Sequence, residues 1–208
     1  MKFCLRLAAC LLCLISVQAV AEGDAAAGQA KSAICAACHG ADGNSIVPQW
    51  PKLAGQHPEY LVRQLTLIQS GARPVPEMTG IVAGLSEQDF ADLAAWFASQ
   101  QMSGGVAEES QVFEGQLIWR AGNAASGVPA CMACHGPAGE GNPLAGYPKL
   151  SGQHAMYTAN MLKRFHAGEN WGEKDANSHV MNGVAAALSE DEIAALASFI
   201  EGLYLAED

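Results

Sequence analysis

The chain carries the same ordered set of sequence blocks twice, and this duplication constrains its fold more than any other feature. The paired blocks are "CAACHG" (35–40) and "CMACHG" (131–136), "WPKLAGQHPEY" (50–60) and "YPKLSGQHAMY" (147–157), and the segments "MTGIVAGLSE" (78–87) and "MNGVAAALSE" (181–190). Ordered blocks at a separation of about one hundred residues indicate two copies of one domain, whereas a solenoid needs many short repeats.

The first 21 residues are set apart from this repeat. Lys2 and Arg6 precede an apolar run over 7–17, and Ala19-Val20-Ala21 fits the small-residue cleavage pattern of a secretory signal peptide. The apolar run is too short for a stable membrane-spanning helix, although retention as an anchor stays an alternative. We therefore expect residues 1–21 to be cleaved and the mature protein to reside in the periplasm.

The boundary between the two units is expected within "QMSGGVAEES" (101–110), where Gly104 and Gly105 would end a helix and begin a linker. This gives an N-terminal domain over 22–104 and a C-terminal domain over 105–208. The second copy has six more residues before its Met block. They fall within 165–180, which is rich in Gly, Asn and charge, and we expect a longer surface loop there.

The local patterns predict an all-α fold. Ser86 with Asp89, and Ser189 with Glu192, form capping-box patterns, and each opens a run with apolar residues at helical spacing. Further helices are expected after Asp24 and over 58–70, 110–121 and 155–167. No segment of the mature chain shows the alternation typical of strands.

Each unit contains a CxxCH motif, the spacing used for covalent attachment of haem. Two thiols add to the two vinyl groups, and the adjacent imidazole ligates the iron. The residues concerned are Cys35, Cys38 and His39, and Cys131, Cys134 and His135. A shared zinc site is disfavoured because the two pairs lie far apart in the chain, and a thioredoxin-like dithiol would need a βαβ context. The sequence therefore indicates two covalently attached haem c groups.

A second axial ligand is expected from methionine. Met78 and Met181 occupy matched positions in the repeat, and a thioether with His raises the reduction potential of a haem. His57 and His154 also match, so bis-His ligation remains open, but both precede helices, where they can cap or hydrogen-bond. His179 lies two residues from Met181 and is a further alternative.

The charge of the mature chain limits its partners. Removing Lys2 and Arg6 from the 11 basic residues leaves nine against 21 acidic residues. Such a chain repels nucleic acid, so that partner is excluded, and it suits a protein with a positive docking face.

With "CAACHGADGNSIVPQWPKLAGQ" and the paired M-x6-LS segments, the sequence resembles the dihaem cytochrome c4 family over essentially all of the mature chain. The resemblance implies two class I cytochrome c domains related by a pseudo-twofold axis, with haem propionates facing each other across the interface. It implies His39/Met78 and His135/Met181 as axial pairs. It also implies a periplasmic electron carrier of a respiratory chain, often with a terminal oxidase as acceptor.

A hydrogen bond from the second ring nitrogen is expected for each haem-ligating histidine. Such a ring usually donates its other N–H to a carbonyl. Pro51 and Pro148 lie 12 and 13 residues past His39 and His135, and a proline carbonyl of this loop plays that role in class I cytochromes. The alternative is that each proline only shapes a turn.

Closed, six-coordinate iron in both repeats favours an electron carrier without substrate turnover over a dihaem peroxidase or reductase, which needs an exchangeable position. The expected partners are a membrane reductase or dehydrogenase as donor and a terminal oxidase as acceptor. The protein is expected to be soluble or peripherally associated with a membrane, either as a free shuttle or as a subunit of a fixed complex.

Overall fold

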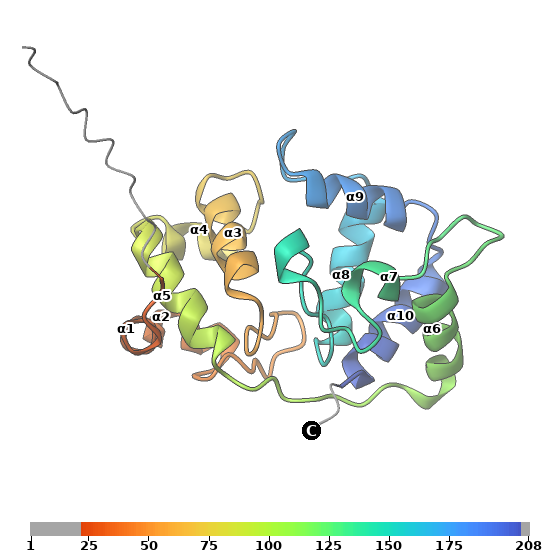
Figure 1. The fold of residues 1–208 in the computed structure, drawn as a ribbon, viewed down its shortest axis with the longest axis horizontal. Coiled ribbons are helices and arrows are strands. Elements are labelled where there is room, and N and C mark those ends of the chain that lie inside the picture. Colours follow the sequence, from red (N-terminus) through yellow and green to blue (C-terminus); the bar gives the residue numbers. More distant parts are fainter. Residues whose placement is uncertain (1–21, 205–208) are drawn as a thin grey trace, which may run out of the picture.

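The computed structural model describes residues 22–204, and within that range the regular elements are helices joined by loops and two isolated β-bridges (Figure 1). The N-terminal half contains α1 (Ala25–Lys31), α2 (Ala33–His39), α3 (Pro58–Gln69), α4 (Pro76–Val82) and α5 (Glu87–Ala98). The C-terminal half contains α6 (Glu109–Ala121), α7 (Met132–His135), the 3₁₀ turn η1 (Pro143–Ala145), α8 (Ala155–His166), α9 (Ala176–Ala185) and α10 (Glu190–Gly202). The all-α prediction is confirmed, while the predicted signal peptide lies outside the described residues.

The capping signals in the sequence mark real helix starts. Ser86 and Ser189 both form complete capping boxes, with Asp89 and Glu192 respectively, and Asp24 accepts hydrogen bonds from the first turn of α1. The sequence analysis did not predict α4 and α9, the helices that carry Met78 and Met181. Their apolar residues are few and their length is only 7 and 10 residues, so the periodic signal is weak.

A glycine lets the first and last helices of each half cross closely. A Cβ on Gly28 of α1 would lie 2.0 Å from the Asp92 carbonyl oxygen of α5, and one on Gly115 of α6 would lie 2.3 Å from the Ala195 carbonyl oxygen of α10. Asp92 and Ala195 occupy matched positions in the repeat. Both halves therefore pack their terminal helices in the same way, backbone against backbone.

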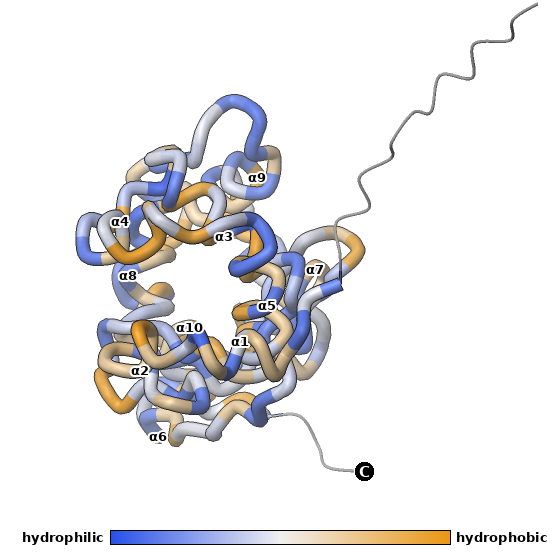
Figure 2. The backbone as a smooth tube through the Cα atoms, turned by 90° about the vertical axis from the view of Figure 1, so that its left-hand side faces the viewer, coloured by the Kyte–Doolittle hydropathy of each residue, from blue (hydrophilic) through white to orange (hydrophobic). Residues whose placement is uncertain are grey.

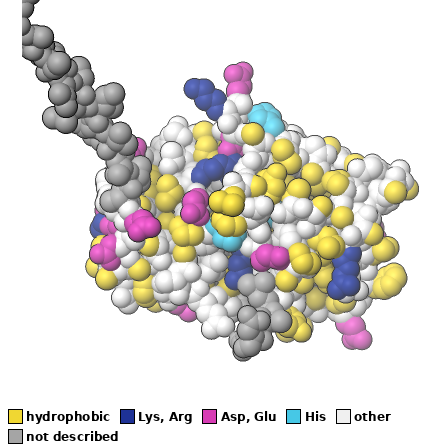
Figure 3. Space-filling view, viewed as in Figure 1, with side chains coloured by type: hydrophobic (Ala, Val, Ile, Leu, Met, Phe, Trp, Pro, Cys, Tyr) yellow, Lys and Arg dark blue, Asp and Glu magenta, His cyan; other side chains and the backbone are white. Residues whose placement is uncertain are grey.

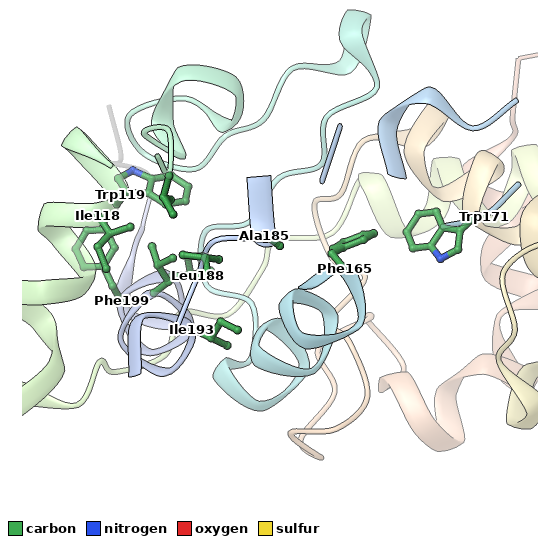
Figure 4. Close-up of a cluster of buried hydrophobic side chains, with 11 residues drawn as sticks. Ile118, Trp119, Phe165, Trp171, Ala185, Leu188, Ile193 and Phe199 are labelled. Atoms are coloured by element: carbon green, nitrogen blue, oxygen red, sulfur yellow. The ribbon is translucent and has the colours of Figure 1, made fainter. Parts of the chain in front are cut away.

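Each half has its own apolar core. Leu61, Leu93 and Phe97 form one cluster of the N-terminal half, and Ile68, Val82 and Phe90 form another. The C-terminal core is larger; Figure 4 shows that it extends from the α6–α10 crossing, through Ala185, to Phe165 and Trp171. In Figure 2, hydrophobic and hydrophilic residues alternate along the helices, as expected for elements buried on one side.

The two halves meet through reciprocal hydrogen bonds from the "PKLxGQ" segments. The Gln153 side chain accepts from the Lys52 N–H and donates to the Lys52 carbonyl, both at 2.9 Å. Gln56 makes the same two bonds to Lys149, also at 2.9 Å. The pairing is isologous, as a pseudo-twofold axis requires, because each residue has its repeat counterpart opposite it.

We call the interface formed by these four hydrogen bonds the seam. The linker between the halves lies along the seam and begins earlier than expected. Helix α5 ends at Ala98 rather than near Gly104, and the side chain of Asn44 then binds the Gln101 carbonyl at 3.0 Å and the Ser103 N–H at 2.7 Å. The buried Lys52 ammonium donates to the Ser103 carbonyl at 2.7 Å. The division of the domains after Gly104 stays a prediction.

The longer segment over 165–180 is only partly a surface loop. Gly172, Glu173 and Lys174 are exposed, but Trp171 and Asp175 are 5% and 7% exposed. The segment precedes α9 and reaches toward α3 of the other half (Figure 1). The sequence suggested exposure because the segment is polar; its two buried residues find partners in the N-terminal half, which local composition cannot reveal.

The face seen in Figure 3 carries hydrophobic side chains among scattered charges. Large hydrophobic residues with at least half of their surface exposed include Ile46, Val106, Phe113 and Leu144. Among residues 22–204, no helix has the length and apolar character needed to cross a membrane.

Candidate functional site

Both CxxCH histidines make the hydrogen bond predicted for them. The Nδ1 atom of His39 lies 2.8 Å from the Pro51 carbonyl oxygen, and that of His135 lies 3.0 Å from the Pro148 carbonyl oxygen. A carbonyl can only accept, so Nδ1 carries the proton and Nε2 keeps a free lone pair. The predicted contacts of the two imidazoles with the proline carbonyls are confirmed in both halves.

The environment keeps both imidazoles neutral. His39 and His135 are each 6% exposed. Burial lowers the pKa of both rings, and the hydrogen bond to the proline carbonyl offsets part of that effect. A neutral imidazole with a free Nε2 is the form that ligates a metal.

Helices α2 and α7 position the cysteines and the histidine of each CxxCH motif. Cys35 and Cys38 are three residues apart on α2 and therefore lie on one face, with His39 in the last turn. In the second half Cys131 directly precedes α7, which contains Cys134 and His135. Gly40 and Gly136 end the two helices at φ values of 81° and 79°, where a side chain would be strained.

The first cysteine of each CxxCH pair faces apolar neighbours. Cys35 packs against the cluster of Leu61, Leu93 and Phe97, and Cys131 packs against the C-terminal core. Burial raises the pKa of Cys35 and raises that of Cys131 to about 11. Within residues 22–204 no group of three or more His, Cys, Asp and Glu side chains is arranged to hold a metal ion.

The two methionines lie at equivalent apolar surfaces. Met78 on α4 packs against the cluster of Ile68, Val82 and Phe90, which shares Leu85 with the cluster that contacts Cys35. Met181 on α9 and Cys131 pack against the same C-terminal core. Both methionines are half-buried. Their role as axial ligands stays a prediction.

The rival histidines are engaged elsewhere. His57 Nε2 lies 2.8 Å from the Glu140 carbonyl oxygen, and His154 Nε2 lies 2.7 Å from the Ser45 carbonyl oxygen, so each ring contacts the opposite half. His154 Nδ1 also lies 3.3 Å from the Glu201 carboxylate. The expectation that these rings hydrogen-bond is confirmed, although neither side chain caps its helix. If His57 or His154 ligated an iron through Nε2, its hydrogen bond to the opposite half would be lost.

Buried polar atoms without a partner indicate where a carboxylate belongs. Arg73 is 6% exposed, and its guanidinium donates to Gln64 Oε1 at 2.8 Å and to the Tyr157 hydroxyl at 3.0 Å. Among residues 22–204, the Arg73 Nε, the Gln64 amide nitrogen and the Thr158 hydroxyl are buried and have no hydrogen-bond partner. Haem is an apolar ring bearing two carboxylates, so the paired thiols, free Nε2 atoms, apolar walls and buried cation fit it.

Sequence reasoning missed the polar residues between the halves. Lys52, Gln56, Lys149 and Gln153 lie in segments whose repetition was noticed, so matched polar residues were the available signal for an interface. Arg73 has no counterpart in the repeat. No sequence signal could have found it, because its partners come from both halves.

Comparison with known families gives two matches to this chain. The Cytochrome c family matches residues 23–101 and again residues 115–203. A cytochrome c4 of Pseudomonas aeruginosa is 52% identical over 184 residues, which cover 88% of this chain and 90% of the relative. A more distant relative, a thiosulfate dehydrogenase electron acceptor of Stutzerimonas stutzeri, is 36% identical over 170 residues, covering 79% of this chain and 76% of the relative.

The fold is also similar to a solved structure. Reduced recombinant cytochrome c4 from Pseudomonas stutzeri superimposes with a TM-score of 0.83 at 49% sequence identity. The match covers 88% of this chain and 100% of that chain. Sequence and structure comparisons thus agree over both halves.

Proposed function

Because this chain belongs to the dihaem cytochrome c4 family and carries two covalently attached haem c groups, we propose that it is a periplasmic electron carrier of a respiratory chain that donates electrons to a terminal oxidase. The observation that carries the proposal is the duplicated contact between His39 and the Pro51 carbonyl, and between His135 and the Pro148 carbonyl. It orients a neutral imidazole in both halves.

The proposed ligands follow from this arrangement. Thioethers from Cys35 and Cys38, and from Cys131 and Cys134, would hold the two groups. The axial pairs would be His39 with Met78 and His135 with Met181. Haem supplies an iron that changes oxidation state by one electron, and His/Met ligation gives it a high potential.

The protein's own contribution is rigidity and exclusion of water. The proline carbonyls fix the tautomer and orientation of each imidazole, so the ring need not turn when charge changes. The apolar clusters around Cys35, Met78 and Met181 keep the site dry. Two strong-field ligands leave no position open for a substrate, which supports a carrier rather than an enzyme.

Two sites in one chain suit entry of electrons at one half and exit at the other. The reciprocal bonds between Gln56 and Lys149, and between Gln153 and Lys52, fix the spacing of the halves. Because the spacing is fixed, the two halves need not move relative to each other before an electron passes between them.

The surface supports a partner with a positive, partly apolar face. Ile46 and Leu144 are 92% and 100% exposed, and each lies in the loop between the CxxCH histidine and its proline. The net charge of the mature chain is strongly negative. The opposite charges would speed association with the partner protein, and the exposed side chains of Ile46 and Leu144 would be buried in the complex. Peripheral association with a membrane through such a partner belongs to the same proposal.

One specific comparison suggests which enzyme donates electrons to this protein. The 36% identical relative from Stutzerimonas stutzeri is named for accepting electrons from thiosulfate dehydrogenase. The alternative is that a dehydrogenase of this kind reduces the present protein.

Mixing experiments with the purified protein test the proposal. Reduced protein is added to membranes that contain terminal oxidases, and its absorption is followed on admission of oxygen. We expect reoxidation that cyanide blocks and that slows with added salt, because the attraction is screened. Absence of cyanide-sensitive reoxidation contradicts oxidase donation. Reduction by thiosulfate dehydrogenase and thiosulfate tests the alternative donor, and fractionation of cells tests the periplasmic location.

A further inference from the structure

The additional segment of the C-terminal half contributes a buried aromatic residue to the N-terminal half. Trp171 packs against Phe165 of its own half, with ring centroids 5.4 Å apart. Its ring also faces the guanidinium of Arg73, whose Cζ lies 4.8 Å from the ring centroid. A second cation, Arg63, lies 5.9 Å from that centroid. In Figure 4 Trp171 extends beyond the core of its own half toward the ribbon of the other.

Local hydrogen bonds hold Trp171 in this position. Its backbone N–H donates to the Ser178 hydroxyl at 3.1 Å, and Asp175 accepts from the Ser178 N–H at 3.0 Å to cap α9. Asp175 also accepts from Nε of Arg63, on α3 of the other half, at 2.9 Å. Trp171, Asp175 and Ser178 are all buried. The segment is therefore fixed both within its own half and to the opposite one.

Arg73 depends on the C-terminal half for most of its surroundings. Gln64 is its side-chain partner from the N-terminal half, whereas the Tyr157 hydroxyl, the Met161 sulfur and the Trp171 ring come from the other half. Its Nε and the nearby Gln64 amide nitrogen remain without partners among the described residues. A buried cation of this kind needs an anion.

We propose that Trp171 is a positioning residue that holds Arg73 against a carboxylate of the N-terminal haem, so that the C-terminal half sets the reduction potential of that haem. The inference rests on the proposed axial ligation. Arg73 belongs with the N-terminal haem because it lies in the connection from α3 to α4, five residues before Met78, and binds Gln64 on α3.

The electrostatic consequence has a definite sign. A fixed cation in a buried site favours the reduced haem, which carries one positive charge fewer than the oxidised form. Loss of the Trp171 ring would release Arg73 from its position beside the haem carboxylate. The N-terminal haem would then be oxidised more easily, and its potential would fall, although the substituted residue belongs to the other half.

Redox titrations of five variants test this, with each haem followed through its own NMR signals. Trp171→Ala should lower the potential of the N-terminal haem and leave that of the C-terminal haem in place, and Trp171→Phe should restore most of the loss. Arg73→Gln should lower the same potential, and adding Trp171→Ala to it should change nothing further. Lys163→Gln is the control, because Lys163 is a cation of the same half that pairs with Glu190 at 2.7 Å and shares no partner with Arg73 among the described residues.

Three results would overturn the proposal: an unchanged N-terminal potential in Trp171→Ala, a shift confined to the C-terminal haem, or additive effects of Trp171→Ala and Arg73→Gln. A shift of equal size in Lys163→Gln would show that the potential responds to any substitution in the C-terminal half and would also overturn it. The absorption band of Met-ligated ferric haem is recorded for each variant. Its absence already in the unsubstituted protein would refute the proposed ligation instead.

Discussion

Gln153 of the C-terminal half binds both backbone groups of Lys52 in the N-terminal half, each at 2.9 Å. The amide side chain accepts from the N–H and donates to the carbonyl of the same residue, as a neighbouring strand does in a β-sheet. Because Gln56 does the same to Lys149, the two halves are held by four equivalent bonds. The repeated "GQ" of the sequence thus serves to join the domains.

Gln153→Ala should lower the free energy of unfolding by about 1–3 kcal/mol, because the buried N–H and carbonyl of Lys52 lose their partner. Thermal unfolding followed by circular dichroism measures the loss. Gln56→Ala is the matched variant and should have a similar cost. Unchanged stability in both would mean that the seam contributes little to holding the protein together.

Met78→His should lower the reduction potential of the N-terminal haem and leave that of the C-terminal haem nearly unchanged, because thioether sulfur favours the reduced iron more than imidazole does. Met181→His should have the converse effect. A potentiometric titration resolves the two steps. If neither substitution moves either step, the axial assignment is wrong.

Gly28→Ala should destabilise the N-terminal half, since the added methyl group would lie 2.0 Å from the Asp92 carbonyl oxygen and force α1 from α5. Overpacking of this kind costs about 1–3 kcal/mol. Gly104→Ala is the control, because a Cβ there meets no atom within 4 Å. Chemical denaturation compares the two variants, and equal stabilities would refute the close crossing.

The free energy of unfolding should depend on pH through the carboxyl group of Asp92. Hydrogen bonds from the Lys31 ammonium, the Asp24 N–H and the Gln88 amide lower the pKa of Asp92 from 3.8 to about 2. A depressed carboxyl pKa adds stability that is present above the unfolded value and is lost as pH falls through the folded value. The free energy of unfolding should therefore decrease between about pH 4 and pH 2, and Asp92→Asn should make that decrease smaller. Denaturation curves at several pH values check it; parallel curves for the two proteins would contradict it.

The sequence predicted the elements that depend on local chemistry. The capping boxes at Ser86 and Ser189 and the helix after Pro58 follow from short-range signals. The contacts of His39 and His135 with their prolines were implied by the resemblance to class I cytochromes. These features are repeated, so each copy supports the interpretation of the other.

The features that sequence analysis missed are those formed between the halves. Trp171 sits in a polar segment and is buried between Phe165 of its own half and Arg63 and Arg73 of the other half. The roles of Gln56 and Gln153 likewise require knowing which backbone lies opposite. Contacts between residues about one hundred positions apart leave no periodic trace in a single sequence.

The central claim is that the exported chain carries a haem on each CxxCH motif. Intact mass spectrometry of the mature protein tests it most directly. We predict the mass of a chain beginning at Glu22 plus two haem groups, retained under denaturing conditions because thioether bonds hold them. A mass equal to the bare polypeptide, or to the polypeptide with a single haem, would contradict the account.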